Sequence, residues 1–161
     1  MSDAPTPTYP QPGSAAPDFD LESSAGGRAK LADYAGKTLV LYFYPKADTP
    51  GCTTEAQGFR DAADAYREAG ASVMGVSPDP LKDVAKFAEK QALNFPLLAD
   101  PDHAICEAYG TWQEKSMYGK KYMGAARTTF LIDKDGKVAK VFEKVKPAGH
   151  DAEVLDAVKA M

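Results

Sequence analysis

One cysteine lies where a helix is predicted to begin, directly after a predicted strand. The run LVLYFY at 39–44 is short, apolar and rich in β-favouring residues, and Pro45 ends it. Helical spacing follows, with Thr49 suited to the N-cap and Pro50 to the first helical position. Cys52 therefore falls in the first turn, where unpaired backbone N–H groups and the helix dipole favour negative charge. A thiol there should lose its proton more readily than a free thiol, and the thiolate is the nucleophilic form.

A cysteine at the start of an amphipathic helix also has a purely structural explanation, because cysteine often behaves as a small buried hydrophobe. Position alone favours that explanation, but Cys52 also belongs to a longer pattern: Pro45-x-x-x-Thr49-x-x-Cys52 is followed by Thr53-Thr54-Glu55. This pattern resembles the active-site motif of the peroxiredoxins. The sequence YPKADTPGCTTEA is similar to that of the bacterioferritin-comigratory protein (PrxQ) branch of that family.

Three further stretches carry the same resemblance. They are APDF at 16–19, DHAICEAYGTW at 102–112 and RTTFLIDKDGKV at 127–138. The resemblance therefore covers the chain from about Ala16 to its end. It implies a thioredoxin-like fold and a thiol peroxidase that reduces hydrogen peroxide and organic hydroperoxides. In such an enzyme the peroxidatic cysteine, here Cys52, becomes a sulfenic acid.

This chemistry needs donors or a cation to polarise the O–O bond, and shielding from water. The Thr49 hydroxyl can be offered to the sulfur or to the peroxide, and Pro45 can shield the sulfur. Arginine is a suitable cation because it stays charged and presents a fixed fork of donors. The resemblance gives this role to Arg127, whereas spacing alone leaves Arg127 as an ordinary surface residue. Glu55 either orients Arg127 by a paired hydrogen bond or is a helix-face carboxylate without a special role.

The sequence departs from the PrxQ pattern at Gln57. Many members of that branch carry a second, resolving cysteine five residues after the first, and glutamine occupies this position here. The only other thiol is Cys106, for which we favour a structural role in a predicted helix. We therefore expect a one-cysteine peroxidase, reduced by an external thiol such as thioredoxin, glutaredoxin or glutathione. The alternatives are that Cys106 resolves Cys52, or that the protein is a non-enzymatic thiol redox sensor or a purely structural domain.

Strands and helices are predicted to alternate along the chain. Strands are expected at 16–22 (an edge strand), 28–30, 39–44, 72–77, 95–99, 128–133 and 137–143. Helices are expected at 49–68, 78–91, 103–109 and 149–161, with one helical turn at 31–34. Residues 111–124 are predicted to be a long loop, and 134–136 a hairpin turn. The order predicts an α/β fold, a central mixed sheet with helices on both faces.

Composition bounds the remaining possibilities. Residues 1–15 are rich in Pro, Ser, Thr and Gly and are expected to form a flexible tail before a single domain at 16–161. Of 161 residues, 19 are basic and 23 acidic, so no basic field favours nucleic acid or an anionic membrane. The sequence suggests no secretory signal, so we expect a cytoplasmic protein. Neither a metal nor another cofactor is expected, and we favour a monomer.

Overall fold

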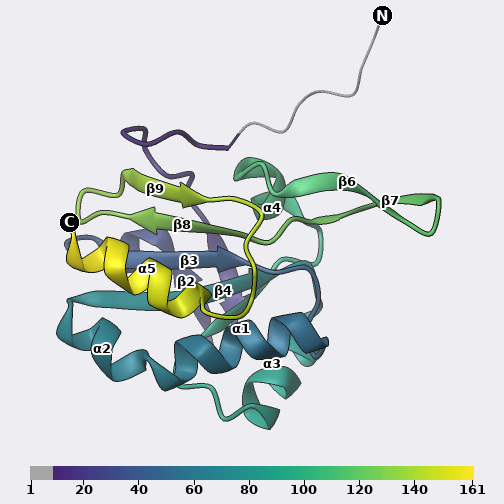
Figure 1. Ribbon diagram of the computed structural model, residues 1–161, viewed down its shortest axis with the longest axis horizontal. Helices are drawn as coiled ribbons and strands as arrows, with labels where there is room; N and C mark the ends of the chain where they lie inside the picture. Colours follow the sequence, from purple (N-terminus) through teal and green to yellow (C-terminus); the bar gives the residue numbers. More distant parts are fainter. Residues whose placement is uncertain (1–8) are drawn as a thin grey trace, which may run out of the picture.

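The computed structural model describes residues 9–161 and contains two β-sheets. The larger sheet has seven strands in the order β2-β1-β5-β4-β3-β8-β9 (Figure 1). Its strands are β1 (Asp20–Ser23), β2 (Arg28–Lys30), β3 (Thr38–Phe43), β4 (Ala71–Ser77), β5 (Leu97–Ala99), β8 (Thr128–Ile132) and β9 (Val138–Phe142). The smaller sheet is a hairpin of β6 (Trp112–Met117) and β7 (Lys120–Ala125).

Helices cover both faces of the larger sheet. They are the 3-10 turn η1 (Leu31–Tyr34), α1 (Pro50–Asp61), α2 (Ala63–Glu68), α3 (Leu81–Lys90), α4 (Ala104–Ala108) and α5 (His150–Lys159). Strand β3 runs parallel to β4 and antiparallel to β8, so the sheet is mixed. Every residue of β3 is buried, as expected for a strand covered on both faces. The predicted α/β architecture, a central mixed sheet with helices on both faces, is confirmed.

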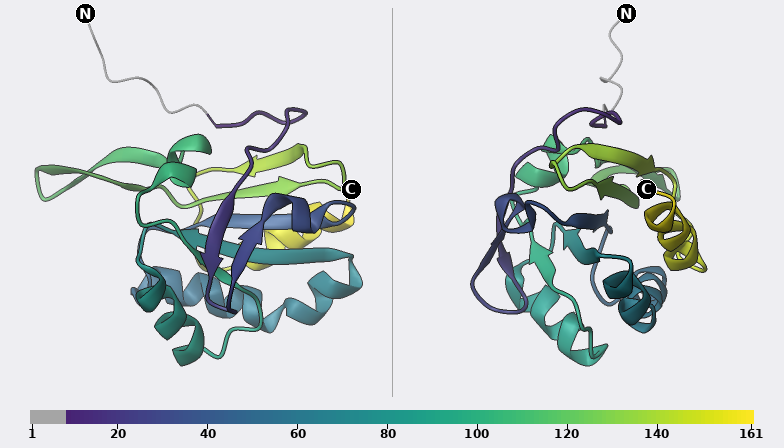
Figure 2. Two further views of the ribbon diagram at one scale, coloured as in Figure 1. Left: turned by 180° about the vertical axis from the view of Figure 1, so that it is seen from behind. Right: turned by 90° about the vertical axis from the view of Figure 1, so that its left-hand side faces the viewer.

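The sheet separates two hydrophobic clusters, one on each face. The first contains buried side chains from four helices: Cys52, Ala56 and Phe59 of α1, Tyr66 of α2, Val84 and Phe87 of α3, and Val154 and Val158 of α5. The second contains Cys106 of α4, with Phe19, Leu21 and Phe130, and η1 packs against it. Figure 1 shows α5 and the α1–α2 segment in front of the sheet, and Figure 2 shows η1, β1 and β2 from behind. The two cysteines therefore belong to opposite faces.

Most predicted elements are present, and three of them need correction. Residues 111–124 are not a loop but the β6–β7 hairpin, whose two turn residues, Tyr118 and Gly119, have φ angles of 52° and 77°. These values suit a type I′ turn, which usually carries Asn-Gly. Because the sequence here is Tyr-Gly, the usual turn signal is absent and the hairpin was not predicted. The helix predicted at 49–68 is divided into α1 and α2 at Ala62, where ψ is 3°. Strand β1 is not an edge strand, because it lies between β2 and β5.

Residues 9–15, expected to belong to a flexible tail, make specific contacts. The Gly13 N–H donates to Val138 O at 2.8 Å, and Ala15 forms a bridge with Lys137. The ring of Tyr9 lies 6.0 Å from that of Phe130. Residues 9–15 are therefore held against the start of β9 and Phe130 instead of forming part of a free tail. Residues 1–8 of the predicted tail lie outside the described residues.

Candidate active site

Strand register explains how two distant segments meet at the predicted site. Phe43, the last residue of β3, pairs with Thr128, the first residue of β8. Because β3 and β8 are antiparallel, the residue before Thr128 lies beside the segment that follows Phe43. That segment leads into α1 and Cys52, and the residue before Thr128 is Arg127. The sheet thus brings together two residues that are far apart in the sequence.

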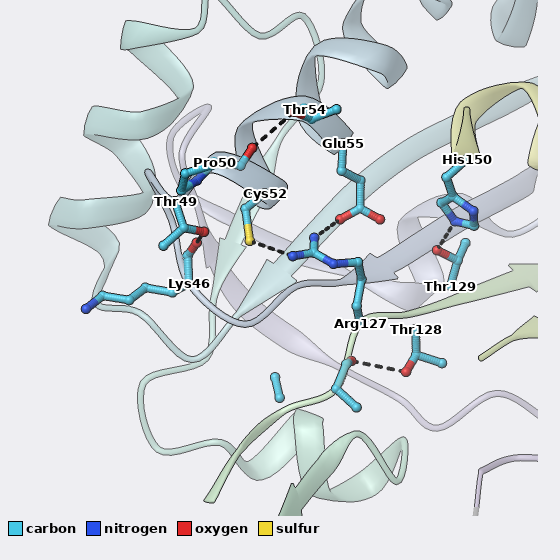
Figure 3. A network of polar contacts seen from close by, with 12 residues as sticks. Lys46, Thr49, Pro50, Cys52, Thr54, Glu55, Arg127, Thr128, Thr129 and His150 are labelled. Carbon is cyan, nitrogen blue, oxygen red and sulfur yellow. Dashed lines mark hydrogen bonds and ion pairs between the residues drawn. The ribbon is translucent and has the colours of Figure 1, made fainter. Parts of the chain in front are cut away.

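Cys52 occupies the first turn of α1, as predicted. Pro50 is the first helical residue, and Thr49 is the N-cap residue with extended backbone angles. Cys52 is a free thiol and is 1% exposed. The Thr49 hydroxyl makes no cap to the helix; it donates instead to Lys46 O at 2.9 Å. With its proton committed to that carbonyl, the Thr49 oxygen is left as an acceptor next to the first turn of α1 (Figure 3).

Arg127 bridges Cys52 and Glu55. One guanidinium nitrogen, Nη2, donates to Cys52 Sγ at 3.4 Å, and Nη1 donates to Glu55 Oε1 at 2.7 Å (Figure 3). The Glu55 side chain is 0% exposed and that of Arg127 is 16% exposed. The guanidinium is thus held on one side by a buried carboxylate and directed on the other at sulfur, which places a fixed cation beside Cys52 Sγ. Glu55 thus has the hydrogen bond to Arg127 that the first of its two interpretations requires.

The electrostatics of this pair reflect its burial. Burial raises the pKa of Glu55 to about 7, although the Arg127 guanidinium acts in the opposite direction. For Arg127, burial lowers the pKa, but the negative charges of Glu55 and Cys52 outweigh it and raise the value overall. Arg127 therefore stays charged, whereas the Glu55 carboxylate is in the range where it can take up a proton near neutral pH.

Two residues that sequence analysis did not single out shape the site. A Cβ atom added to Gly51 would lie 3.1 Å from Arg127 Nη2 and 3.4 Å from Pro147 Cγ. Glycine thus lets the guanidinium lie against the first turn of α1 without the small shift that a side chain at this position would require. The available signal was a glycine in the first turn of a helix, directly before the cysteine, because glycine there costs helix stability. Pro147, from the loop between β9 and α5, gave no signal.

Lys115 of β6 is a second cation near the site. Its ammonium group donates to Ala125 O, two residues before Arg127. Burial lowers the pKa of Lys115, as does the charge of Arg127, whereas Cys52 acts in the opposite direction. A lysine of the hairpin therefore contributes positive charge to the same region as Arg127.

Cys106 is not brought to the site. It lies in α4 and is 0% exposed, in the cluster on the other face of the sheet from Cys52. Its backbone N–H donates to Asp100 Oδ2 at 2.8 Å, and Thr111 Oγ1 donates to Cys106 O. Burial, followed by the neighbouring Asp100 carboxylate, raises the pKa of the Cys106 thiol. A buried thiol that keeps its proton is a poor nucleophile.

Within residues 9–161 no group of three or more His, Cys, Asp or Glu side chains could hold a metal ion. Over the same stretch, no helix combines the length and the apolar character needed to cross a bilayer.

Pro45, predicted to shield the sulfur, is half-buried and follows Tyr44, which shares a hydrophobic cluster with Cys52.

Comparisons with known proteins agree with this geometry. Residues 12–141 match the model of the AhpC/TSA family. The chain is 50% identical to peroxiredoxin Bcp of Bacillus subtilis over 149 residues, which is 92% of this chain and 95% of that protein. It is 47% identical to peroxiredoxin Bcp of Escherichia coli over 147 residues, 91% of this chain and 94% of that protein.

Solved structures give the same result. The bacterioferritin comigratory protein of Xanthomonas campestris superposes with a TM-score of 0.84 at 44% identity, covering 88% of this chain and 90% of that one. A cysteine-to-serine mutant of PrxQ from Xylella fastidiosa superposes with a TM-score of 0.89 at 36% identity, covering 95% of this chain and 98% of that one. The chain belongs to the AhpC/TSA family, among the Bcp/PrxQ peroxiredoxins, and is a thiol peroxidase.

Proposed function

We propose that Cys52 is the peroxidatic cysteine of this enzyme and that it reduces hydrogen peroxide and organic hydroperoxides. The observation that carries the proposal is the bridge in which Arg127 donates both to Cys52 Sγ and to Glu55 Oε1. Organic hydroperoxides are included because the Xanthomonas campestris relative is described as having alkyl peroxide reduction activity.

The first step is nucleophilic substitution at oxygen. The Cys52 thiolate attacks one peroxide oxygen, so that an S–O bond forms and the O–O bond breaks. The electron pair of the O–O bond leaves on the second oxygen, which takes up a proton to become water or an alcohol. Cys52 is oxidised to a sulfenic acid, and the peroxide is reduced.

The neighbouring residues then have separate roles. Arg127 stabilises the thiolate and the charge that develops on the peroxide oxygens. Thr49, whose proton is donated to Lys46 O, accepts a hydrogen bond from the peroxide O–H. Glu55 is a positioning residue that holds the Arg127 fork. Pro45 limits the access of water to the sulfur.

We further propose that the cycle uses one cysteine of this chain. Gln57 occupies the position of the usual resolving cysteine, and its side-chain amide donates to Gln91 Oε1 at 2.9 Å. Cys106 lies in the cluster on the opposite face of the sheet, and a disulfide needs Cα atoms within about 7 Å. An external thiol then attacks the sulfenic acid and releases water. A second thiol reduces the mixed disulfide and regenerates Cys52.

The proposed reductant is a thiol of the thioredoxin, glutaredoxin or glutathione type. We also propose that residues 16–161 act as a single domain, in a monomer that works in the cytoplasm without a metal or another cofactor. The net charge of −4 is consistent with a partner other than nucleic acid or an anionic membrane.

The test is intact mass after one equivalent of hydrogen peroxide, with free thiols trapped. The expected product gains one oxygen at Cys52 while Cys106 remains free, and Cys52→Ser abolishes the reaction. The matched control Cys106→Ser is expected to leave this first oxidation intact. Loss of two hydrogens with Cys52 and Cys106 linked would refute the one-cysteine cycle. A mass that stays unchanged over minutes would refute Cys52 as the peroxidatic residue.

A further inference from the structure

The β6–β7 hairpin stands apart from the rest of the protein. Figures 1 and 2 show it extending from one end of the molecule, beyond the larger sheet. Its strands pair with each other through six residue pairs and, within residues 9–161, with no strand of the larger sheet. An isolated two-stranded hairpin is only marginally stable in water, and its open edges invite pairing with another chain.

Exposed hydrophobic side chains are concentrated on this hairpin. Four large hydrophobic residues are exposed in the described part of the chain, and three of them belong to it: Tyr118 at 97%, Tyr122 at 44% and Met123 at 51%. Tyrosine and methionine are enriched in protein–protein interfaces relative to the remaining surface. The composition of the hairpin is therefore that of a contact surface rather than of a solvated turn.

Tyr118 has no evident role in stabilising the hairpin itself. Its φ angle of 52° is in the left-handed region, which asparagine or glycine adopts at lower cost. The ring is almost fully exposed, so no burial offsets that cost. A tyrosine where asparagine would suit the turn better points to a contact outside this chain.

The charge of the hairpin is opposite to that of the whole protein. Its strands and turn contain Lys115, Lys120 and Lys121 against one acidic residue, Glu114, whereas the chain as a whole has a net charge of −4. Lys120 and Lys121 are exposed, and Lys121 Nζ lies 3.7 Å from Glu114 Oε1 in a solvent-exposed ion pair within the hairpin. A basic, partly apolar arm on an acidic molecule is complementary to an acidic protein surface.

The hairpin is directly continuous with the active site. Strand β7 ends at Ala125, and Arg127, the residue that donates to Cys52 Sγ, follows after one further residue. Six residues of strand span roughly 20 Å, so the tip is too far from Cys52 for a small thiol to touch both. A protein can contact the hairpin while its own thiol reaches the sulfur.

We propose that the β6–β7 hairpin is the docking arm for an acidic protein whose thiol reduces the Cys52 sulfenic acid. This inference rests on the proposed function and adds to it the surface that binds the reductant. The partner contacts Tyr118, Tyr122 and Met123 and pairs its acidic groups with Lys120 and Lys121. The chemistry is the one given above: the partner thiol forms a mixed disulfide with Cys52 and water leaves.

The test compares turnover of hydrogen peroxide with three reductants: an acidic thioredoxin with its NADPH-dependent reductase, glutathione, and dithiothreitol. The double variant Lys120→Glu/Lys121→Glu is expected to lower kcat/KM for thioredoxin about tenfold at low salt, and the loss should shrink as salt rises. Tyr118→Asn suits the turn and should fold at least as well, yet we expect it to lower kcat/KM for thioredoxin about fivefold. Turnover with dithiothreitol should stay within about twofold for both variants, because a small thiol does not need the arm.

A matched control makes the same charge change elsewhere. Lys134→Glu/Lys137→Glu lies at the β8–β9 turn, at the other end of the sheet (Figure 1), and should leave thioredoxin turnover unchanged. Equal losses in the control and in the hairpin variants would overturn the docking surface, as would a preference for glutathione that no variant alters. Self-association that the hairpin variants abolish, with thioredoxin turnover intact, would assign the arm to a second copy and also overturn the proposal. Absent turnover with dithiothreitol in the unaltered protein would instead refute the peroxidase cycle itself.

Discussion

At the scale of single residues, the carboxylate of Glu55 is in an energetically unfavourable environment. The side chain is fully buried, and its Oε2 atom has no hydrogen-bond partner within residues 9–161. A buried acceptor left without a donor costs free energy, and the same burial raises the pKa of Glu55 to about 7. The residue accepts this cost while its other oxygen holds Arg127. Functional sites often retain such unfavourable groups.

The pH dependence of Cys52 oxidation should therefore contain a contribution from Glu55. As the pH falls through about 7, Glu55 takes up a proton, and Arg127 loses the charged acceptor that holds its fork. We expect the rate of oxidation by hydrogen peroxide to fall over this range. Glu55→Gln keeps an oxygen that can accept from Arg127 but cannot titrate, so its profile should lack the inflection near pH 7 and have a lower plateau. Stopped-flow rates measured from acidic to mildly alkaline pH test this, and an inflection that survives in Glu55→Gln would contradict the assignment.

At the scale of secondary structure, α1 presents Cys52, and α5 packs beside the strand that follows Arg127. The first turn of α1 presents Cys52, and the close approach at Gly51 allows Arg127 to lie against it. The start of α5 is anchored by His150, which is 1% exposed. Its ring shares hydrogen bonds with Thr129 Oγ1 on β8 at 2.7 Å and with Glu153 Oε1 at 2.6 Å. Helix position is thereby tied to the strand that begins beside Arg127.

Gly51→Ala should separate activity from stability. The added Cβ would lie 3.1 Å from Arg127 Nη2, so the guanidinium must move by a few tenths of an ångström. We expect the rate of Cys52 oxidation to fall about tenfold, because small misplacements of a positioned group are costly. The free energy of unfolding should stay unchanged or rise by up to about 1 kcal/mol, since alanine favours helix over glycine. Urea unfolding and stopped-flow oxidation test this, with exposed Thr54→Ala in the same helix as a control that also gains helix propensity but should leave the oxidation rate unchanged.

His150→Ala should lower the free energy of unfolding. Removing the ring leaves a cavity between Phe59 and Phe142 and takes away the partner of the Thr129 hydroxyl. We expect a loss of about 2–4 kcal/mol in the free energy of unfolding, measured in urea. The control Lys159→Ala, on the exposed last turn of α5, should stay within about 0.5 kcal/mol. A loss for His150→Ala no larger than that of the control would contradict an anchoring role.

At the scale of the whole molecule, the sheet keeps the two thiols apart. Cys52 lies after the carboxyl end of the central strand β3, on the face covered by α1, α2, α3 and α5. Cys106 lies in the cluster on the other face. A direct disulfide would require one of them to cross a sheet whose central strand is buried on both sides. This separation of the two thiols is the basis for proposing an external reductant.

We expect the protein to be a monomer in solution. The exposed large hydrophobic residues of the described chain are few and, apart from Met161, confined to the β6–β7 hairpin, which is narrow for an obligate interface. Light scattering after size-exclusion chromatography should give the monomer mass of 17.2 kDa. A mass of twice that value at micromolar concentration would contradict this prediction.

Local patterns were sufficient to predict much of the fold. The strand before Cys52, the helix start at Thr49 and Pro50, and the hairpin turn at 134–136 are all present. Each depends on interactions between residues close in sequence, which is why periodicity and turn chemistry reveal them. The β6–β7 hairpin was not predicted, because Tyr118 occupies a turn position where asparagine or glycine is expected.

By itself, the sequence determined the candidate nucleophile: a cysteine in the first turn of a helix that follows a buried strand, within a motif specific enough to indicate the family. Only the tertiary structure decided what surrounds it. The pairing of Phe43 with Thr128 places Arg127 at Cys52, and the layer structure places Cys106 on the far face. The physical reason is that strand register and layer order arise from contacts between distant segments, and no local pattern encodes them.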